Sequence, residues 1–312
     1  MSARCLYCYK LLNGPEADFH PACSKKIFGQ SIPPELPYSE DRLESLAEEI
    51  IKSHTTVTGV QPKLSLHLTK GDNETKRFTI VGLWGGYILK PPTPNYPQLP
   101  EVEGLTMRLA SIAKIKTVPH TLIRLQSGNL AYITKRIDRA KKAKLRMEDM
   151  CQLTGRLTEE KYRGSYEQVA KAIQKYSVMP GLDVVNFFEV VLFSFLTGNA
   201  DMHLKNFSLI EQAGTGMVLS PAYDLVATAL VNPSDDEELA LNLNGKKKKI
   251  KKVDFNSALE SLKIGKRQQA NIFSKMEKAK PLWDNEIDAS FLSKDFKLNY
   301  KALIENRFEK LA

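Results

Sequence analysis

Residues 184–210, VVNFFEVVLFSFLTGNADMHLKNFSLI, determine how the rest of the chain is interpreted. The first part of this stretch is strongly apolar, which predicts a buried helix at the centre of a core. Directly after it, Asp201, His203, Lys205 and Asn206 place a carboxylate, an imidazole, an ammonium group and an amide within six residues. A buried helix ordinarily ends in a cap and a turn, so this group of polar side chains predicts a functional site at its end.

The composition is that of a soluble globular protein. The chain has 312 residues, of which 42% are hydrophobic and 26% are charged, which is enough for one large domain or two lobes with a proper core. There are 45 Lys and Arg residues against 36 Asp and Glu residues, a net charge of +9. This balance favours anionic partners in general and identifies none of them.

Nothing in the sequence indicates export or membrane attachment. The first residues, MSARCLYCYK, lack a basic stretch followed by an apolar one, so we expect no signal peptide. The longest apolar run, residues 184–196, is short and contains Asn186 and Glu189, so we do not expect it to span a membrane. Four cysteines, three of them near the N-terminus, suit a reducing compartment. We therefore expect a cytoplasmic protein.

The order of the expected elements is sheet first and helices later, which is an α+β pattern. Between about residues 55 and 138 we expect an antiparallel sheet with one inserted helix. One strand is expected within each of 63–70, 120–125 and 130–138, one or two within 77–92, and the inserted helix at 101–115. Another helix is expected before the sheet, at 39–54. After Met147 the apolar spacing is helical, with helices expected at 148–156, 165–177, 182–198, 253–264, 266–279 and 298–311. We place the boundaries at residues 1–38, 39–139 and 140–312.

The N-terminal segment, residues 1–38, carries closely spaced cysteines and a histidine. Cys5 and Cys8 form a C-x₂-C pair, and His20 and Cys23 form an H-x₂-C pair eleven residues later. Zinc prefers four tetrahedral sulfur and nitrogen ligands at such spacings, so this segment is a candidate zinc module. The alternative is that the cysteines are buried thiols and the histidine lies on the surface. The fourth cysteine, Cys151, is expected in the core.

Five residues occur in the order that phosphoryl transfer from a nucleotide needs. Lys90 ends an apolar strand, and the helix after it offers Glu101 or Glu103 as its partner. Asp201 is suited to orient a substrate hydroxyl, while Asn206 and a later carboxylate, Asp224, supply oxygen ligands for Mg²⁺. Each could instead be an ordinary loop or surface residue, but their order and spacing favour a kinase.

The chain nevertheless departs from ordinary eukaryotic-type protein kinases. The five-residue spacing from Asp201 to Asn206 matches the catalytic loop of that class. No His-Arg pair precedes Asp201, however, and Asp224 is not followed by Phe-Gly. The sequence also has no glycine-rich G-x-G-x-x-G loop.

Six stretches together resemble a known family. They are TTVTGVQPKLSL (55–66), YILKPP (87–92), YITKRIDR (132–139), EDMCQLTG (148–155), GNADMHLKNFSLI (198–210) and LSPAYDL (219–225). In this order they resemble the HipA-type serine/threonine kinase toxins of bacterial toxin–antitoxin systems. The resemblance covers about residues 50–255. It implies a bilobal protein-kinase-like fold, with a sheet-rich N-lobe and a helical C-lobe, that uses ATP and Mg²⁺.

The resemblance also assigns roles to particular residues. Asp201 resembles the catalytic base, Asn206 and Asp224 the metal ligands, and Lys90 the phosphate-binding lysine, with Glu103 as its partner. The stretch Thr58, Gly59, Val60, Gln61, Pro62 and Lys63 resembles the loop over the phosphates, although it holds a single glycine. Lys135, Arg136 and Ile137 resemble the hinge whose backbone pairs with adenine. His203, Lys205 and Tyr223 are expected beside the nucleotide.

The resemblance further implies substrates, partners and regulation. The implied substrate is a serine or threonine of a translation protein, such as an aminoacyl-tRNA synthetase. Thr56 and Thr58 fall where the family carries regulatory phosphorylation sites, although they could be ordinary strand residues. We expect the chain to lack the usual N-terminal subdomain, as short, HipT-like members do. The implied partners are a HipB-type DNA-binding antitoxin, a separately encoded HipS-like protein that supplies that subdomain, or both.

Two other functions remain open from the sequence alone. A small-molecule kinase acting on lipids or antibiotics would use a similar Asp and Asn loop, and a nucleotide-binding regulator would need no catalysis. The run NGKKKKIKK at 244–252 could contact phosphate backbones, but it lacks interleaved aromatic residues. We expect it to be a solvated face or a helix entry, and we expect no direct nucleic-acid contact.

Overall fold

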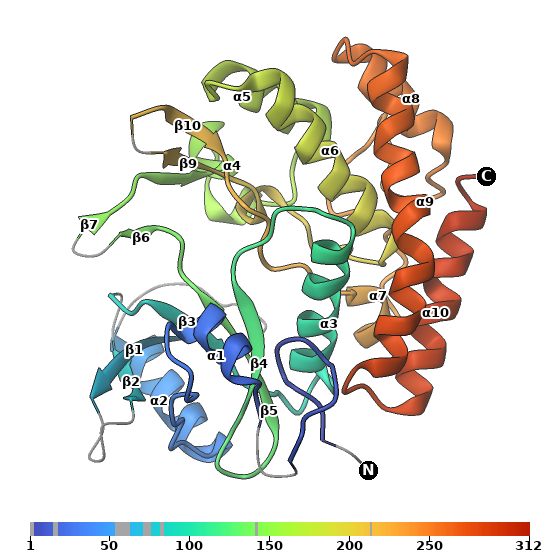
Figure 1. Ribbon diagram of the computed structural model, residues 1–312. Helices are drawn as coiled ribbons and strands as arrows, with labels where there is room; N and C mark the ends of the chain where they lie inside the picture. Colours follow the sequence, from blue (N-terminus) through green and yellow to red (C-terminus); the bar gives the residue numbers. More distant parts are fainter. Residues whose placement is uncertain are drawn as a thin grey trace. The chain divides into compact units, whose positions relative to one another are not determined.

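The computed structural model describes residues 3–14, 18–53, 63–70, 76–81, 84–140, 143–212 and 214–312, and for residues 47–53, 70 and 140 the backbone alone. The chain forms two compact units (Figure 1). Unit 1 comprises Met1–Gly104, Val118–Ile137 and Ala289–Phe291. Unit 2 comprises Leu105–Thr117, Asp138–Asp288 and Leu292–Ala312. Unit 1 is built on an antiparallel sheet and unit 2 mainly on helices, which confirms the α+β class.

Unit 1 contains a five-stranded antiparallel sheet with the strand order β2-β1-β3-β5-β4. The strands are β1 (Leu64–Lys70), β2 (Lys76–Val81), β3 (Tyr87–Lys90), β4 (His120–Arg124) and β5 (Leu130–Lys135). Leu64 and Leu66 alternate with polar residues in β1, and both are buried, because successive side chains of a strand point to opposite faces. The strands expected from the sequence are confirmed.

Unit 1 also contains α1 (Pro21–Phe28), α2 (Glu40–Ser53) and the first residues of α3 (Leu99–Ile112), which continues into unit 2 from Leu105. The helices expected at 39–54 and 101–115 are confirmed as α2 and α3. A β-carbon added at Gly104 in α3 would lie 3.0 Å from the Leu122 side chain on β4. Glycine here lets the helix backbone approach the sheet closely, and a larger residue would require the Leu122 side chain to shift.

The Cys/His segment packs into unit 1. Pro21 begins α1, and Gly29 ends it in the left-handed conformation at φ 75°, as is usual for helix termini. Phe28 of α1 lies 5.8 Å from the ring of Phe78, measured between centroids. The hydroxyl of Tyr87 donates to the Ile27 carbonyl at 3.1 Å. The segment therefore shares its apolar core with the sheet.

Unit 2 is organised around α6 (Pro180–Leu196), which the sequence predicts as the central buried helix. Its Phe187, Phe188, Phe193 and Phe195 are fully buried. The other helices are α4 (Met150–Leu153), α5 (Tyr166–Tyr176), α7 (Thr228–Val231), α8 (Lys252–Ser261), α9 (Lys266–Ala289) and α10 (Lys294–Glu309), with short 3₁₀ turns at Thr158–Glu160 and Leu204–Asn206. Helices α9 and α10 lie side by side (Figure 1), joined by the ion pair between Lys280 and Glu305. Among the described helices, none has the length and apolar content to cross a bilayer.

Two expectations about this half were incomplete. Residues from Met147 onward were expected to be helical, yet β8 (Met147–Asp149), β9 (Ser208–Gln212) and β10 (Gly216–Leu219) form a three-stranded antiparallel sheet. Before Met147, β6 (Arg139–Ala140) pairs with β7 (Ala143–Lys144). Such short strands show too little alternation to be recognised. Helix α9 also continues past residue 279 through Pro281, because Trp283 and Ile287 bury its last turns.

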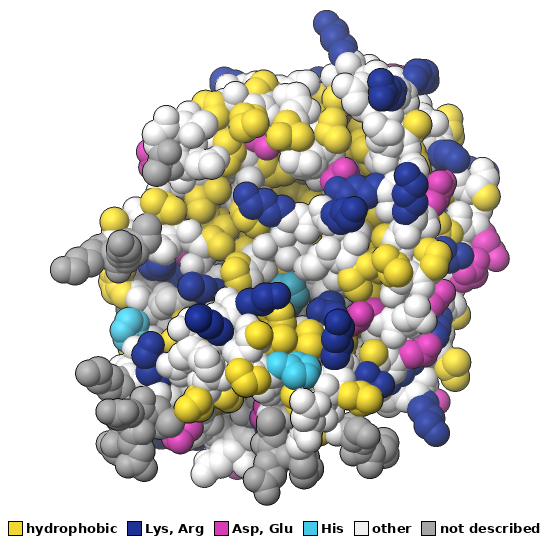
Figure 2. All heavy atoms as spheres, viewed as in Figure 1, with side chains coloured by type: hydrophobic (Ala, Val, Ile, Leu, Met, Phe, Trp, Pro, Cys, Tyr) yellow, Lys and Arg dark blue, Asp and Glu magenta, His cyan; other side chains and the backbone are white. Residues whose placement is uncertain are grey.

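The lysine run is paired with the acidic run before it. Lys247 contacts Glu237 at 3.2 Å and Lys248 contacts Asp236 at 2.5 Å. Lys246 contacts Asp254 in α8 at 2.8 Å. Figure 2 shows Lys and Arg side chains interspersed with apolar ones over the face in view. The run is a partly neutralised surface that leads into α8.

Candidate active site

Lys90 and Glu103 form a buried ion pair in unit 1. Lys90 ends β3 and is 3% exposed, while Glu103 on α3 is fully buried. The Lys90 Nζ lies 2.5 Å from the Glu103 Oε1 and 5.4 Å from the centroid of the Tyr132 ring. Glu103 is thus the partner, and Glu101, whose pKa is raised by burial, is not. A buried charge held in one geometry by its partner is suited to contact an anionic ligand.

The stretch expected to be an adenine-binding hinge begins at Lys135, the last residue of β5. Two of its backbone N–H groups already have protein partners. The Lys135 N–H donates to the Pro119 carbonyl at 2.8 Å, and the Arg136 N–H donates to the Gly86 carbonyl at 2.9 Å. Backbone pairing of this stretch with adenine would therefore use the N–H group of Ile137 or the backbone carbonyl groups of the stretch.

Asp201 lies at the end of α6 in unit 2, and its side chain is 48% exposed. One carboxylate oxygen accepts a hydrogen bond from the Tyr162 hydroxyl at 2.5 Å. Burial, and then the charge of Asp201, raise the pKa of Tyr162, so the phenol keeps its proton and remains a donor. The Asp201 N–H donates to the Asn199 side chain at 3.1 Å. The carboxylate is therefore both accessible and held in position.

Tyr162 was not recognised from the sequence. It lies in the irregular stretch KYRGS at 161–165, where no periodic pattern or motif marks it. Its ring also packs edge-on against His203 at 5.0 Å between centroids. The only available signal was an aromatic residue with a polar tip in a polar loop, which is common in proteins.

Asn206 is buried, and its amide is oriented by the backbone. The Asn206 Nδ2 donates to the Asp201 carbonyl at 2.8 Å. Because the nitrogen must be the donor to a carbonyl, the amide oxygen remains as an acceptor. An amide oxygen of this kind is a suitable ligand for Mg²⁺.

His203 is buried, and the charges of Asp201 and Asp224 both act on its ring. Its Nε2 lies 4.0 Å from an Asp201 carboxylate oxygen, and its Nδ1 has no hydrogen-bond partner among the described residues. Burial lowers the pKa of His203 to about 4, although the negative charges of Asp201 and Asp224 oppose this. His203 is therefore neutral at pH 7. Both carboxylates act on the same ring, which places them in one region of unit 2.

Asp224 has a left-handed backbone conformation with φ 55°. This region is costly for most residues but tolerated by Asp, and such conformations concentrate at functional sites. The preceding Tyr223 hydroxyl bonds with Ser208 at 2.5 Å and donates to the Lys205 carbonyl at 3.1 Å. The Lys205 Nζ contacts Asp149 at 2.8 Å. Lys205 and Tyr223 thus fix the loop that carries Asn206.

The expected phosphate loop is largely outside the described residues. This applies to Thr56, Thr58, Gly59, Val60, Gln61 and Pro62. Lys63 is described directly before β1, where it is exposed.

The four expected metal ligands are brought together in unit 1. One potential ligand atom from each of Cys5, Cys8, His20 and Cys23 lies within 4.8 Å of all the others. The His20 Nδ1 is 3.4 Å from the Cys8 sulfur, and the His20 Nε2 is 2.9 Å from the Leu11 carbonyl. Because a carbonyl requires a donor, Nε2 carries the proton and Nδ1 presents its lone pair to the sulfurs. The arrangement fits a tetrahedral metal ion.

The fold and these residues define a protein-kinase-like molecule, and the comparisons with known proteins specify its family. The family model described as HipA-like C-terminal domain matches residues 55–283. Because this is most of the chain, the protein belongs to the HipA-like C-terminal domain family.

Relatives carry kinase names. The chain is 30% identical over 210 residues to a "Putative kinase" of Haemophilus influenzae, covering 63% of this chain and 59% of the relative. It is 33% identical over 207 residues to "Putative kinase Y4dM" of Sinorhizobium fredii, covering 62% of this chain and 49% of the relative. The chain therefore matches only about half of the length of these relatives.

Solved structures support the fold. HipA of Shewanella oneidensis, solved with HipB and operator DNA, has a TM-score of 0.66 at 21% identity and covers 90% of this chain and 74% of that chain. The Helicobacter pylori proinflammatory kinase CtkA has a TM-score of 0.54 at 13% identity and covers 79% of this chain and 93% of that chain. The expected kinase-like fold is confirmed.

Proposed function

We propose that the protein is a kinase that transfers the γ-phosphate of ATP to a serine or threonine of another protein. The observation that supports this most strongly is the loop of unit 2 in which Asp201 is accessible, held by Tyr162, and joined to Asn206 through its own carbonyl. Asp201 would accept the proton as the substrate oxygen attacks the γ-phosphorus and ADP leaves. Tyr162 occupies one carboxylate oxygen, and the other would receive the hydroxyl.

The remaining residues would bind the nucleotide and its metal ion. Lys90, oriented by Glu103, would contact the phosphates. The Asn206 amide oxygen and the Asp224 carboxylate would hold Mg²⁺, which prefers oxygen ligands and keeps several waters. When bound, the ion neutralises the charge that develops on the phosphates. His203 would remain neutral and support the loop rather than exchange protons.

Incubation of the purified protein with γ-labelled ATP and a bacterial lysate tests the kind of substrate. A labelled protein band is expected. A labelled small molecule would instead identify a lipid- or antibiotic-type kinase, and the absence of any labelled product would leave only nucleotide binding. Within the protein class, we propose translation proteins such as aminoacyl-tRNA synthetases as targets.

We also propose control by phosphorylation of the stretch before β1, at Thr56 or Thr58. A phosphate adds about −1.5 to −2 charges, and it would repel the ATP phosphates bound nearby. Mass spectrometry after incubation with ATP should find phosphate on one of these threonines in wild-type protein and none on the Asp201→Asn variant. Full activity of Thr56→Asp and Thr58→Asp proteins would contradict this mode of control.

The proposed setting is a cytoplasmic toxin–antitoxin pair. The structural neighbour from Shewanella oneidensis was solved with HipB and operator DNA, which favours a HipB-type partner for this chain. A small HipS-like protein that supplies an N-terminal subdomain is the other proposed partner. Affinity purification from the native cell should recover one or both of them, and a chain that purifies alone would contradict this proposal.

We propose that Cys5, Cys8, His20 and Cys23 hold one structural zinc ion. Tyr9, directly after Cys8, packs edge-on against Phe291 at 5.1 Å between centroids. A β-carbon at Gly104 of α3 would lie 3.5 Å from the Tyr9 hydroxyl. Metal binding would therefore stabilise the segment that supports α3 next to Glu103.

Metal analysis tests the zinc assignment. Purified protein should contain about one equivalent of zinc, and chelation should lower its melting temperature, because a structural metal contributes directly to folding. The double variant with Cys5→Ser and Cys8→Ser should lose the metal. Cys151→Ser, which changes a cysteine outside the cluster, should keep it. A zinc content below a tenth of an equivalent in wild-type protein would overturn the assignment.

A further inference from the structure

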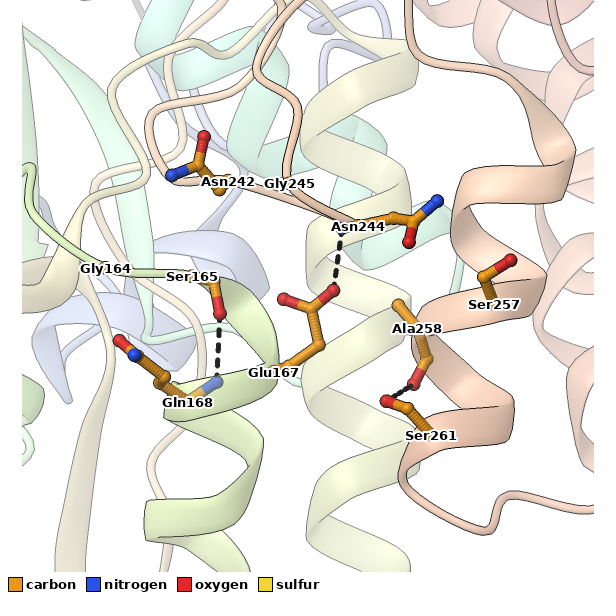
Figure 3. Close-up of a pocket in the computed structure, with 10 residues that line it drawn as sticks. All are labelled: Gly164, Ser165, Glu167, Gln168, Asn242, Asn244, Gly245, Ser257, Ala258 and Ser261. Atoms are coloured by element: carbon orange, nitrogen blue, oxygen red, sulfur yellow. Dashed lines mark hydrogen bonds between the residues drawn. The ribbon is translucent and has the colours of Figure 1, made fainter.

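A pocket of about 470 Å³ lies in unit 2, lined by residues from 164–168, 242–245 and 257–261. The start of α5, the turn before α8, and α8 itself surround it (Figure 3). Ser165 and Glu167 come from the α5 side, Asn242 and Asn244 from the turn, and Ser257 and Ser261 from α8. The volume is within the usual range for ligand sites, about 300–1,000 Å³. Among the residues that line it, Glu167 carries the single charge.

The Glu167 carboxylate is held in place but incompletely satisfied. One oxygen accepts the Asn244 N–H at 2.7 Å, as Figure 3 shows. The other oxygen is buried and has no hydrogen-bond partner within the described part of the chain. Lys246, which follows the same turn, is paired with Asp254 at 2.8 Å. A position in the first turn of α5 explains an acidic residue here, but it does not explain a buried oxygen without a donor, which is costly.

The pocket and Asp201 share one short segment of chain. Tyr162 donates to Asp201 at 2.5 Å, and three residues later Ser165 lines the pocket. The Tyr166 hydroxyl donates to the carbonyl of Met202, next to Asp201, at 3.1 Å. Three residues of chain span about 10 Å at most. Tyr162 and Ser165 therefore lie within about 10 Å of each other along the chain, a separation that about three to five residues of a substrate peptide can span.

We propose that this pocket binds a lysine or arginine side chain of the protein substrate, three to five residues from the phosphorylated hydroxyl. A cationic donor would satisfy the buried oxygen of Glu167 and neutralise its charge. The amides and hydroxyls around it would accept or relay the remaining N–H groups. Glu167 is then a specificity-determining residue. This proposal rests on the proposed kinase function, and it names the class of protein segment that the enzyme selects.

A positional peptide library tests the proposal. Each peptide carries one serine and a single Arg, Ala or Glu at one position up to five residues on either side. The wild-type protein with ATP and Mg²⁺ should favour Arg at one of the positions three to five residues away. Loss of a charge-assisted hydrogen bond predicts that Glu167→Gln lowers kcat/KM for that peptide by about 10- to 100-fold. The kcat/KM of Glu167→Gln for the alanine peptide should equal that of the wild-type protein.

Two controls complete the design. Glu159→Gln removes an exposed charge nearby that does not line the pocket, and it should leave the preference intact. Glu167→Arg should reverse the preference toward the glutamate peptide. A wild-type protein that ignores the basic residue, or a Glu167→Gln protein that keeps the preference, would overturn the proposal.

Binding without catalysis separates this proposal from the kinase assignment. The basic peptide should bind to the wild-type protein in calorimetry without ATP, and to Asp201→Asn protein equally well, but more weakly to Glu167→Gln. If binding follows Glu167 while no variant transfers phosphate, the pocket assignment stands and the proposed function fails. If phosphate is transferred but binding is indifferent to Glu167, the pocket assignment fails alone.

Discussion

Asp201→Asn should reduce phosphoryl transfer from ATP by about 10²–10⁴-fold, the usual range for the loss of a general base. The asparagine keeps the shape of the side chain and can still accept the Tyr162 hydrogen bond, so we expect the melting temperature to change little. The measurement is the initial rate of transfer from γ-labelled ATP, normalised to folded protein by circular dichroism.

The matched control for this prediction is Asp284→Asn, which removes an equal charge from an exposed position on α9. It should transfer phosphate at the wild-type rate. An Asp201→Asn protein with near wild-type activity would show that Asp201 is a structural residue at the end of α6. In that case the catalytic loop would have to be sought elsewhere.

Glu103→Ala should lower the free energy of unfolding by about 3–5 kcal/mol, because it leaves the charge of Lys90 buried without its partner. The effect is expected to be large since Lys90 is only 3% exposed and Glu103 is fully buried. Urea denaturation measures it. Glu101→Gln, on the same helix, should change stability far less because Glu101 is not the partner of Lys90.

A double variant separates the structural from the functional role of this pair. Lys90→Met combined with Glu103→Leu replaces the ion pair by apolar side chains, which is often neutral for stability. We therefore expect most of the lost stability to return while phosphate transfer stays low, since the phosphates lose their cation. Recovery of both properties would mean that Lys90 and Glu103 serve folding alone.

The sequence predicted those features that depend on local pattern. The alternation around Leu64 and Leu66 and the apolar length of α6 specify their elements without tertiary information. The spacing from Cys5 to Cys23 likewise anticipated the cluster that the fold assembles. In each case the signal is a repeat or a spacing within a few tens of residues, which local geometry determines.

Other features depend on contacts that no local pattern encodes. The choice of Glu103 over Glu101 follows from how α3 is rotated against β3. The contact between Tyr162 and Asp201 joins residues 39 positions apart, and neither belongs to a motif that mentions the other. The strands β8, β9 and β10 are stabilised by pairing with one another rather than by their own short sequences.

The lysine run, which the sequence alone allows to contact phosphates, is paired with the acidic run in the structure. In the sequence, the lysines at 246–249 could have contacted phosphate backbones. In the structure, Lys247 and Lys248 contact Glu237 and Asp236, and the expectation of a solvated face that enters a helix is consistent with this pairing. Partial neutralisation of the lysines weakens the argument for a nucleic-acid surface.

The proposed function is the transfer of phosphate from ATP to serine or threonine. The most direct test is phosphoamino acid analysis of the proteins labelled by purified enzyme with γ-labelled ATP and Mg²⁺, compared with the Asp201→Asn protein. We predict acid-stable label that comigrates with phosphoserine or phosphothreonine, and none of it with the variant. Wild-type protein that binds ATP but labels no protein, or label that persists in the Asp201→Asn sample, would contradict the account.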